Sequence, residues 1–331
     1  MTLLSVPVID IAPFREGGEY DRRAVAAAVD AACRDIGFLV VSGHGIAERM
    51  LTEVAEVTRG FFDLPLEEKM RVHRPAPDVS RGYVGIEGES VGRSRDASAT
   101  AGDLNESFMI GPVDPPDPEY ASAAAAGQHF APNLWPTEPG GLKEVYTAYY
   151  RAMGDLAALL MEIFAAALEL PRDYFVDKID KHISRLRVRN YPEPRVTPLP
   201  GQLRAGAHSD YGSLTILATE DRPGGLQVYN ADGEWVDVPI VPRTFVINIG
   251  DLLARWTNDR WVSTLHRVAN PDEGDVAGSR RQSLIFFHNP NYDAEIRCIP
   301  TCVAPGVQPK YEPTTSGEHL RRLFATTQNV A

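Results

Sequence analysis

Short strands separated by turns dominate the chain after Lys181, and this pattern restricts the possible folds more than any other feature. The strand candidates are residues 185–191, 213–218, 226–229, 235–238, 245–249, 266–268 and 283–287. Turn sequences such as Arg-Pro-Gly-Gly at 222–225 separate them. Many short strands separated by such turn sequences are typical of an antiparallel barrel or a jelly-roll sandwich. We therefore expect a β-rich core in the C-terminal half of the chain.

The first part of the chain has an alternating α/β pattern instead. Residues 6–11 and 38–41 are strand candidates, and apolar residues at helical spacing predict helices at 21–35 and 46–62. The strongest helix is predicted between 141 and 170, where Pro171 ends it. The stretches 75–102 and 114–139 are rich in Gly, Pro and small residues, which is typical of long surface loops with a binding role. Together the patterns predict an α+β fold, with a jelly-roll core, an N-terminal α/β region and a long supporting helix.

Composition and charge argue against several classes of function. The chain has 331 residues, 44% of them hydrophobic, and a formal net charge of −12 that opposes binding to nucleic acid or to an anionic membrane surface. No apolar run approaches the ~18 residues of a membrane span, and the first residues lack the pattern of a signal peptide. The three cysteines are too sparse for a disulfide framework. We expect a cytoplasmic protein that acts on a small molecule, with the oligomeric state open and compatible with a monomer.

A candidate metal site begins with His208 and Asp210, two residues apart at the edge of the predicted β region. Side chains alternate along a strand, so both can point toward one ion. His266, on another short strand candidate, can supply a third ligand. Two histidines and one carboxylate leave one face of an octahedral ion open, which suits Fe(II), a chelating cosubstrate and O2. From the ligand types alone, zinc and manganese remain alternatives.

Arg281 and Ser283 form a second pair with the same spacing, at the start of an apolar strand candidate. An arginine that faces a cavity is costly to bury without an anionic partner. A dicarboxylate would supply that partner, because a guanidinium binds a carboxylate through two hydrogen bonds and the serine adds a donor. Tyr191 can add a phenol from another strand. The alternative role for Arg281 is a surface salt bridge.

These residues, together with further motifs in the same order, resemble the isopenicillin N synthase-like branch of the 2-oxoglutarate/Fe(II)-dependent oxygenases. The similarity covers nearly the whole chain, and its motifs are Gly-Phe-Leu-Val-Val-Ser-Gly-His-Gly at 37–45, Arg-Gly-Tyr at 81–83, Asp-Leu-Asn-Glu-Ser-Phe at 103–108, His-Ser-Asp at 208–210, Gly-Gly-Leu-Gln-Val at 224–228, Asn-Ile-Gly-Asp at 248–251, His-Arg-Val at 266–268 and Arg-Gln-Ser at 281–283. The resemblance implies an N-terminal α/β region at residues 1–120. It also implies a double-stranded β-helix (jelly-roll) catalytic domain at residues 121–331.

The resemblance also implies the cofactors and the residues that hold them. Fe(II) would be held by His208, Asp210 and His266, with 2-oxoglutarate as cosubstrate and O2 as oxidant. Arg281 and Ser283 would bind the far carboxylate of 2-oxoglutarate. Arg280 competes with Arg281 for this role, but only Arg281 has the Arg-x-Ser spacing.

Other positions are assigned less directly by the resemblance. Tyr191 would contact 2-oxoglutarate, although the position two residues before it, Asn in plant members of the family, is Arg189 in this chain. His44 would belong to a structural turn and not to the metal site. Candidate substrate contacts lie in the variable segments before the β-rich core: Arg81, Tyr83, Glu106 and Phe108.

The implied activity is that of a 2-oxoglutarate-dependent dioxygenase. Such an enzyme oxidises, and by default hydroxylates, a small organic substrate while 2-oxoglutarate is converted to succinate and CO2. One alternative is a 2-oxoglutarate-independent oxidase of the isopenicillin N synthase type, which closes rings or desaturates and uses the Arg-x-Ser pair to hold its substrate. Another is a binding protein that kept the barrel and lost turnover. The sequence does not identify the substrate.

Overall fold

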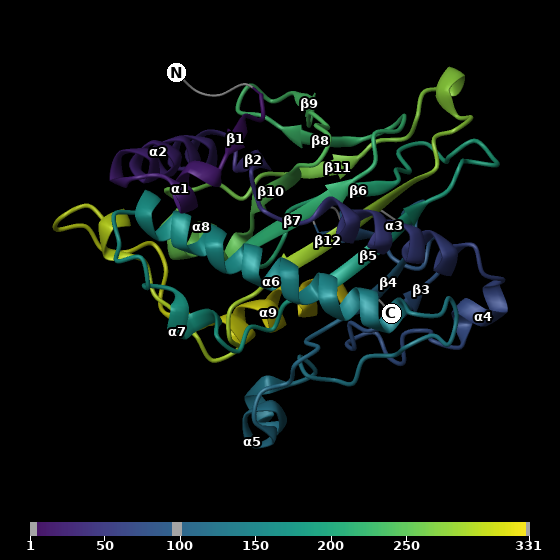
Figure 1. Ribbon diagram of the computed structural model, residues 1–331, viewed down its shortest axis with the longest axis horizontal. Coiled ribbons are helices and arrows are strands. Elements are labelled where there is room, and N and C mark those ends of the chain that lie inside the picture. Colours follow the sequence, from purple (N-terminus) through teal and green to yellow (C-terminus); the bar gives the residue numbers. More distant parts are fainter. Residues whose placement is uncertain (1–4, 95–100, 329–331) are drawn as a thin grey trace.

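Two β-sheets form the centre of the computed structural model, which describes residues 5–94 and 101–328 (Figure 1). The larger sheet has the strand order β1-β2-β10-β7-β12-β5-β4-β3, and the smaller has the order β6-β11-β8-β9. The larger sheet consists of β1 (Val8–Asp10), β2 (Phe38–Ser42), β3 (Gly82–Val84), β4 (Glu106–Ile110), β5 (Arg185–Tyr191), β7 (Leu214–Thr219), β10 (Phe245–Ile249) and β12 (Arg281–His288). The smaller consists of β6 (Ala205–His208), β8 (Leu226–Tyr229), β9 (Trp235–Asp237) and β11 (His266–Val268). The predicted α+β fold with a jelly-roll core is confirmed.

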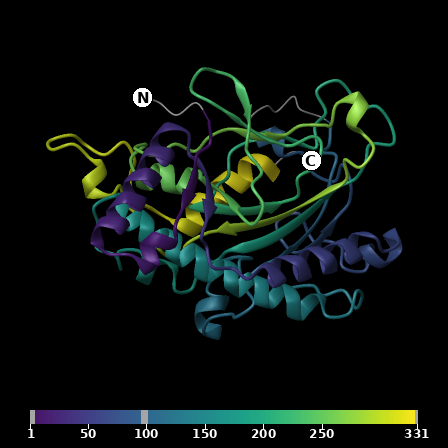
Figure 2. The same cartoon turned by 45° about the horizontal axis from the view of Figure 1, so that its top comes forward.

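Three helices cover the outer face of the larger sheet. They are α2 (Glu19–Asp35), α3 (Glu48–Phe62) and α6 (Leu142–Ala167), all close to their predicted positions. Helix α6 contacts α2, α3, β7 and β12, and in Figure 2 α3 and α6 lie side by side along one face of the sheet. It begins after Gly141, whose φ of 81° suits a residue without a side chain. The supporting helix of the prediction is therefore the layer that buries this face.

Side chains along the strands of the larger sheet point alternately toward this helical layer and toward the space between the two sheets. Side chains that point outward join the main hydrophobic core with α6, and they include Leu186, Val188, Leu214, Ile216, Leu284 and Phe286. The residues between them point inward, toward the smaller sheet. Because successive side chains of a strand point to opposite faces, one residue packs in the core beneath α6 and the next faces the space between the two sheets. The inner face is the one that positions the site.

Strands from the first part of the chain extend the same large sheet. β2 pairs with β10, and β4 pairs with β5, so β1 to β4 flank strands of the C-terminal half on both sides. The division into residues 1–120 and 121–331 stays a prediction. β4 begins within the motif at residues 103–108, at Glu106.

The remaining helices are short, apart from one near the C-terminus. They are α1 (Ala12–Glu16), α4 (Leu66–Met70), α5 (Pro118–Ser122), α7 (Val176–Ile179), α8 (Asp251–Trp256) and α9 (Ser316–Gln328), and a small sheet joins β13 (Glu295–Ile296) to β14 (Thr314–Thr315). Of the predicted surface segment 75–102, residues 95–100 lie outside the described residues. Within residues 5–94 and 101–328, no helix has the length and apolarity to cross a membrane.

Candidate active site

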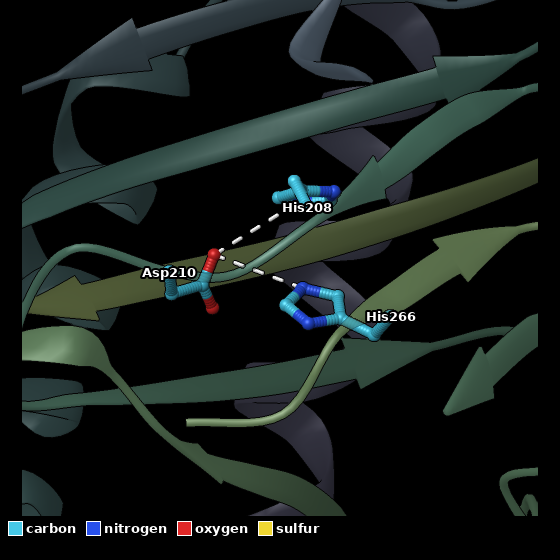
Figure 3. Close-up of side chains that lie close together, drawn as sticks. All are labelled: His208, Asp210 and His266. Atoms are coloured by element: carbon cyan, nitrogen blue, oxygen red, sulfur yellow. Dashed lines mark ion pairs between the residues drawn. The ribbon is translucent and has the colours of Figure 1, made fainter. Parts of the chain in front are cut away.

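The two histidines predicted as metal ligands face each other across neighbouring strands. β6 and β11 pair in antiparallel fashion with His208 opposite His266, and Asp210 follows β6 by two residues. Figure 3 shows the three side chains converging. Asp210 Oδ1 lies 3.9 Å from Nε2 of His208 and 3.7 Å from Nε2 of His266. The potential ligand atoms all lie within 4.8 Å of one another, so the structure brings the predicted triad together.

Backbone contacts orient both imidazole rings. Nδ1 of His208 lies 2.8 Å from the carbonyl oxygen of Gly206, and Nδ1 of His266 lies 3.1 Å from that of Thr264. A ring nitrogen that donates to a carbonyl leaves the lone pair of the other nitrogen free for a metal. Burial, followed by the neighbouring His266, lowers the pKa of His208, so its ring is neutral, as a ligand must be.

Two side chains hold Asp210 by the oxygen that faces away from the imidazoles. Thr215 Oγ1 and Asn248 Nδ2 donate to Asp210 Oδ2, at 2.6 and 2.8 Å. Burial alone would raise the pKa of Asp210, but the two histidines and these hydrogen bonds bring it below its ordinary value. Oδ1 of an ionised carboxylate therefore faces the two Nε2 atoms. This donor set of two nitrogens and one oxygen fits Fe(II) with an open coordination face.

The metal ligands share one cavity with the residues expected to bind the cosubstrate. That cavity is lined by His208, Asp210, His266, Tyr191, Arg281 and Ser283, among others. Phe287, Ile285 and Leu217 add apolar walls. A metal site and an arginine therefore open into the same cavity, which is the arrangement that a chelating dicarboxylate requires.

Arg281 is a buried cation with neutral partners. Its side chain is 1% exposed, and it donates to the carbonyl oxygen of Gly224 at 2.5 Å and to the hydroxyl of Thr219. Among the described residues it forms no ion pair, and its Nε has no hydrogen-bond partner. Burial lowers the pKa of Arg281, although Tyr191, Glu220 and Asp221 act in the opposite direction. Ser283 Oγ lies 3.2 Å from the Thr219 hydroxyl, beside this guanidinium, so the pair fits a carboxylate.

The competing arginine points elsewhere. Arg280 forms an ion pair of 2.6 Å with Asp63 and donates to Asn190 at 3.0 Å. Arg280 is not among the residues that line the cavity. The Arg-x-Ser spacing therefore predicted Arg281, and Arg281 is the arginine of the two that lines the cavity.

Tyr191 and Arg189 both line the cavity from β5. Tyr191 is directly opposite Arg281 in the pairing of β5 with β12, and Arg189 is opposite Ser283. Burial acts to lower the pKa of Arg189, but Tyr191, Asp103 and Glu89 raise it above its ordinary value. The departure from the plant pattern therefore adds a second cation to the cavity, beside the predicted cosubstrate contacts.

Two of the four expected substrate contacts lie on the opposite face of the large sheet. The Glu106 carboxylate accepts from Lys69 Nζ at 2.7 Å and from the hydroxyl of Tyr83 at 2.6 Å. Phe108 is fully buried in the main core, with its ring centre 4.9 Å from that of Phe61. These contacts are structural, because they tie β3 and β4 to the helical layer.

The other two expected contacts are also engaged away from the cavity. Tyr83 is buried, and its hydroxyl is the donor to Glu106. The guanidinium of Arg81 donates to the carbonyl oxygens of Ala131, Ser80 and His129. None of the four lines the cavity that holds the metal ligands. We therefore do not carry Arg81, Tyr83, Glu106 and Phe108 forward as substrate-binding residues.

The sequence reasoning missed a row of arginines on the inner face of β5. Arg185, Arg187 and Arg189 alternate with Leu186 and Val188, which point into the core. This alternation of charged and apolar residues was visible in the sequence, and it predicts a strand with one polar and one buried apolar face. Thr215 and Asn248 were missed because their role depends on a contact with Asp210 across the sheet.

Two sequence families match different parts of the chain. The N-terminal family, described as "non-haem dioxygenase in morphine synthesis N-terminal", matches residues 6–138. The 2OG-Fe(II) oxygenase superfamily matches residues 182–290, which contain all three candidate ligands and the Arg281–Ser283 pair.

Curated relatives and solved structures agree with these matches. A homoarginine-6-hydroxylase of Oryza sativa subsp. japonica is 33% identical, covering 97% of this chain and 97% of the relative. A validamycin A dioxygenase of Streptomyces hygroscopicus subsp. limoneus is 30% identical, covering 88% and 79%. The crystal structure of a full-length Neurospora crassa protein in complex with alpha-KG is 34% identical with a TM-score of 0.85, covering 97% of this chain and 96% of that one.

The alternative of a 2-oxoglutarate-independent oxidase is not favoured by these relatives, and the donor set that the family's iron requires is intact. The chain therefore belongs to the 2OG-Fe(II) oxygenase superfamily, as a 2-oxoglutarate-dependent Fe(II) dioxygenase that acts on a small molecule.

Proposed function

We propose that this enzyme hydroxylates a C–H bond of a small polar molecule, with Fe(II) held by His208, Asp210 and His266. In this proposal Arg281 and Ser283 bind the far carboxylate of 2-oxoglutarate. The observation that carries the proposal is the single cavity lined by all five residues, in which Arg281 has only neutral partners. When bound, Fe(II) and 2-oxoglutarate would activate O2, the oxidant: one oxygen atom goes into succinate as 2-oxoglutarate loses CO2, and the other goes into the C–H bond of the substrate.

Strand β7 supports this placement because it contacts both ends of the proposed site. Thr215 donates to Asp210, and Thr219 accepts from Arg281. Four residues along a strand correspond to about 13 Å. An arginine side chain and a short dicarboxylate together can span this separation, with one end at the metal ligands and the other at the guanidinium.

The residues of the chain have distinct roles in this scheme. The triad would hold Fe(II) and leave room for the cosubstrate, and Thr215 and Asn248 fix Asp210 by Oδ2 so that Oδ1 faces the two imidazoles. The apolar walls formed by Leu217, Ile285 and Phe287 limit the access of water. Exclusion of water protects reactive species from side reactions.

The relatives support a small-molecule substrate. They include an enzyme named for homoarginine, and a second structure of the Neurospora crassa protein is in complex with alpha-KG and thymine. The net charge of −12 disfavours nucleic acid and anionic membranes as partners, and the sparse cysteines are compatible with a cytoplasmic location.

Succinate production tests the proposal. Purified protein with Fe(II), ascorbate and 2-oxoglutarate is incubated with a panel of amino acids, nucleobases and small organic acids. We expect at least one compound to increase the release of succinate and to gain one oxygen atom by mass spectrometry. A complete panel without succinate release, in protein that binds Fe(II), would contradict the proposal.

A further inference from the structure

Arg185 begins the row of arginines on the inner face of β5, and it differs from the others in its partners. It donates to the hydroxyl of Ser80 at 2.9 Å and contacts Nδ1 of His129 at 3.3 Å. Burial, followed by the nearby Arg81, lowers the pKa of Arg185 to about 9. Burial also lowers the pKa of His129 to about 3, so His129 is a neutral acceptor and no counter-ion.

The other two arginines of the β5 row have compensation that Arg185 lacks. Arg187 forms an ion pair with Glu89, and Asp103 lies close enough to Arg189 to raise its pKa. The far carboxylate of 2-oxoglutarate is the proposed partner of Arg281. In the part of the chain that the structure describes, Arg185 forms no ion pair, and its Nε has no hydrogen-bond partner. A partly buried cation of this kind is stabilised when an anion binds beside it.

The position of Arg185 places such an anion near the metal. Arg185 is directly opposite Phe287 in the pairing of β5 with β12, and Phe287 lines the cavity of the metal ligands. Its guanidinium lies over the ring of Phe324 from α9, 4.8 Å from the ring centre. That ring packs against Tyr211, the residue after Asp210, with 5.5 Å between ring centres. A chain of aromatic contacts therefore links Arg185 to the segment that carries a metal ligand.

We propose that Arg185 binds a carboxylate of the organic substrate, and that the substrates of this enzyme are small carboxylic acids. The inference rests on the proposed function, since it places the substrate between Arg185, which does not itself line the cavity of the metal ligands, and Phe287, which does. With its carboxylate at Arg185 and its hydrocarbon part between Phe287 and Phe324, such a molecule presents a C–H bond toward the open face of the metal site. Arg185 and Arg281 then bind two different carboxylates, one of the substrate and one of the cosubstrate.

Binding of benzoate and of its neutral analogue benzamide tests this assignment without knowledge of the substrate. The protein is loaded with Mn(II) and saturated with 2-oxoglutarate, so that the Arg281 site is filled. The enhancement of the proton relaxation rate by Mn(II) then reports probe molecules close to the metal. We expect benzoate to bind at least roughly tenfold more tightly than benzamide, as a charge-assisted hydrogen bond implies.

Variants separate a specific role of Arg185 from a general effect on the fold. Arg185→Gln should weaken benzoate binding by roughly tenfold to a hundredfold, and Arg185→Lys by less, since it keeps the charge. The exposed Arg297, which pairs with Glu295, provides the control Arg297→Gln, for which no change is expected. Each variant must retain 2-oxoglutarate affinity, which shows that the core is folded.

Two results would overturn the inference: equal binding of benzoate and benzamide, or unchanged benzoate binding in folded Arg185→Gln protein. If Arg185→Gln does not fold, the comparison of benzoate with benzamide in the wild-type protein decides, together with benzoate binding in Arg185→Lys. A failure of succinate production in the wild-type protein would contradict the proposed function while leaving the benzoate result intact.

Discussion

The two faces of strands β4 and β5 show how one pair of strands serves stability on one side and chemistry on the other. The outer face contributes Leu186, Val188 and Phe108 to the core beneath α6, and Glu106 to a buried ion pair with Lys69. The inner face holds the arginine row and Tyr191. Adjacent residues therefore have unrelated roles, and a motif that spans both faces does not by itself indicate which of its residues meet the substrate.

The largest effect is expected on the inner side, at the metal. Asp210→Ala removes the only carboxylate of the triad and leaves two imidazoles. Fe(II) affinity should fall by more than the roughly 10–100-fold typical of outer-shell changes, and turnover should be lost. Anaerobic Fe(II) titration measures the affinity, with Asp237→Ala on the exposed side of β9 as the control. Retained Fe(II) affinity in Asp210→Ala would contradict the ligand assignment.

A substitution on the outer face should lower the stability of the fold and leave the binding of 2-oxoglutarate unchanged. The side chains of Glu106 and Lys69 are only 6% and 10% exposed. Glu106→Gln therefore leaves the ammonium group of Lys69 buried without its carboxylate partner. Loss of one partner of a buried pair should lower the free energy of unfolding by about 3 kcal/mol. Chemical denaturation checks this, against the exposed Glu119→Gln, which should change stability by less than about 0.5 kcal/mol. An increase in the KM for 2-oxoglutarate without a loss of stability would reverse the assignment of Glu106.

The adjacent arginines at the start of β12 provide a sharper version of the same comparison. Arg281→Gln should raise the KM for 2-oxoglutarate by roughly 30-fold, because a buried hydrogen-bonded charge pair is lost. Arg280→Gln should leave that KM unchanged, since Arg280 pairs with Asp63 outside the cavity. Steady-state kinetics with varied 2-oxoglutarate measure both. Equal effects of the two substitutions would show that other residues bind the far carboxylate of 2-oxoglutarate.

The smallest effect is expected from the loss of one hydrogen bond to the metal ligand Asp210. Thr215→Val removes the hydroxyl that donates to Asp210 Oδ2 but keeps the volume of the side chain. Because Asn248 still holds the same oxygen, Fe(II) affinity should fall by roughly tenfold. The control Thr301→Val removes a hydroxyl that donates to the carbonyl of Leu168, remote from the metal. An unchanged Fe(II) affinity would show that Asn248 alone positions Asp210.

The sequence predicted the strands and two of the site's residue pairs because both depend on local spacing, whereas His266, distant along the chain, was assigned by the order of the family motifs. Residues two apart on a strand share a face, and this rule placed His208 with Asp210 and Arg281 with Ser283 correctly. It could not place Glu106 and Phe108, because the face that they occupy depends on the register between β4 and β5, which sequence spacing does not reveal. The same limit hid the contacts of Thr215 and Asn248, which cross from one strand to another.

The most direct test of the central claim is a crystal structure of the enzyme with Fe(II) and 2-oxoglutarate, prepared without oxygen. The account predicts iron bound to Nε2 of His208 and His266 and to Oδ1 of Asp210. It also predicts the far carboxylate of 2-oxoglutarate within hydrogen-bond distance of Arg281 and Ser283. Iron bound outside this triad, or a far carboxylate bound by Arg185 or Arg189 instead, would contradict it.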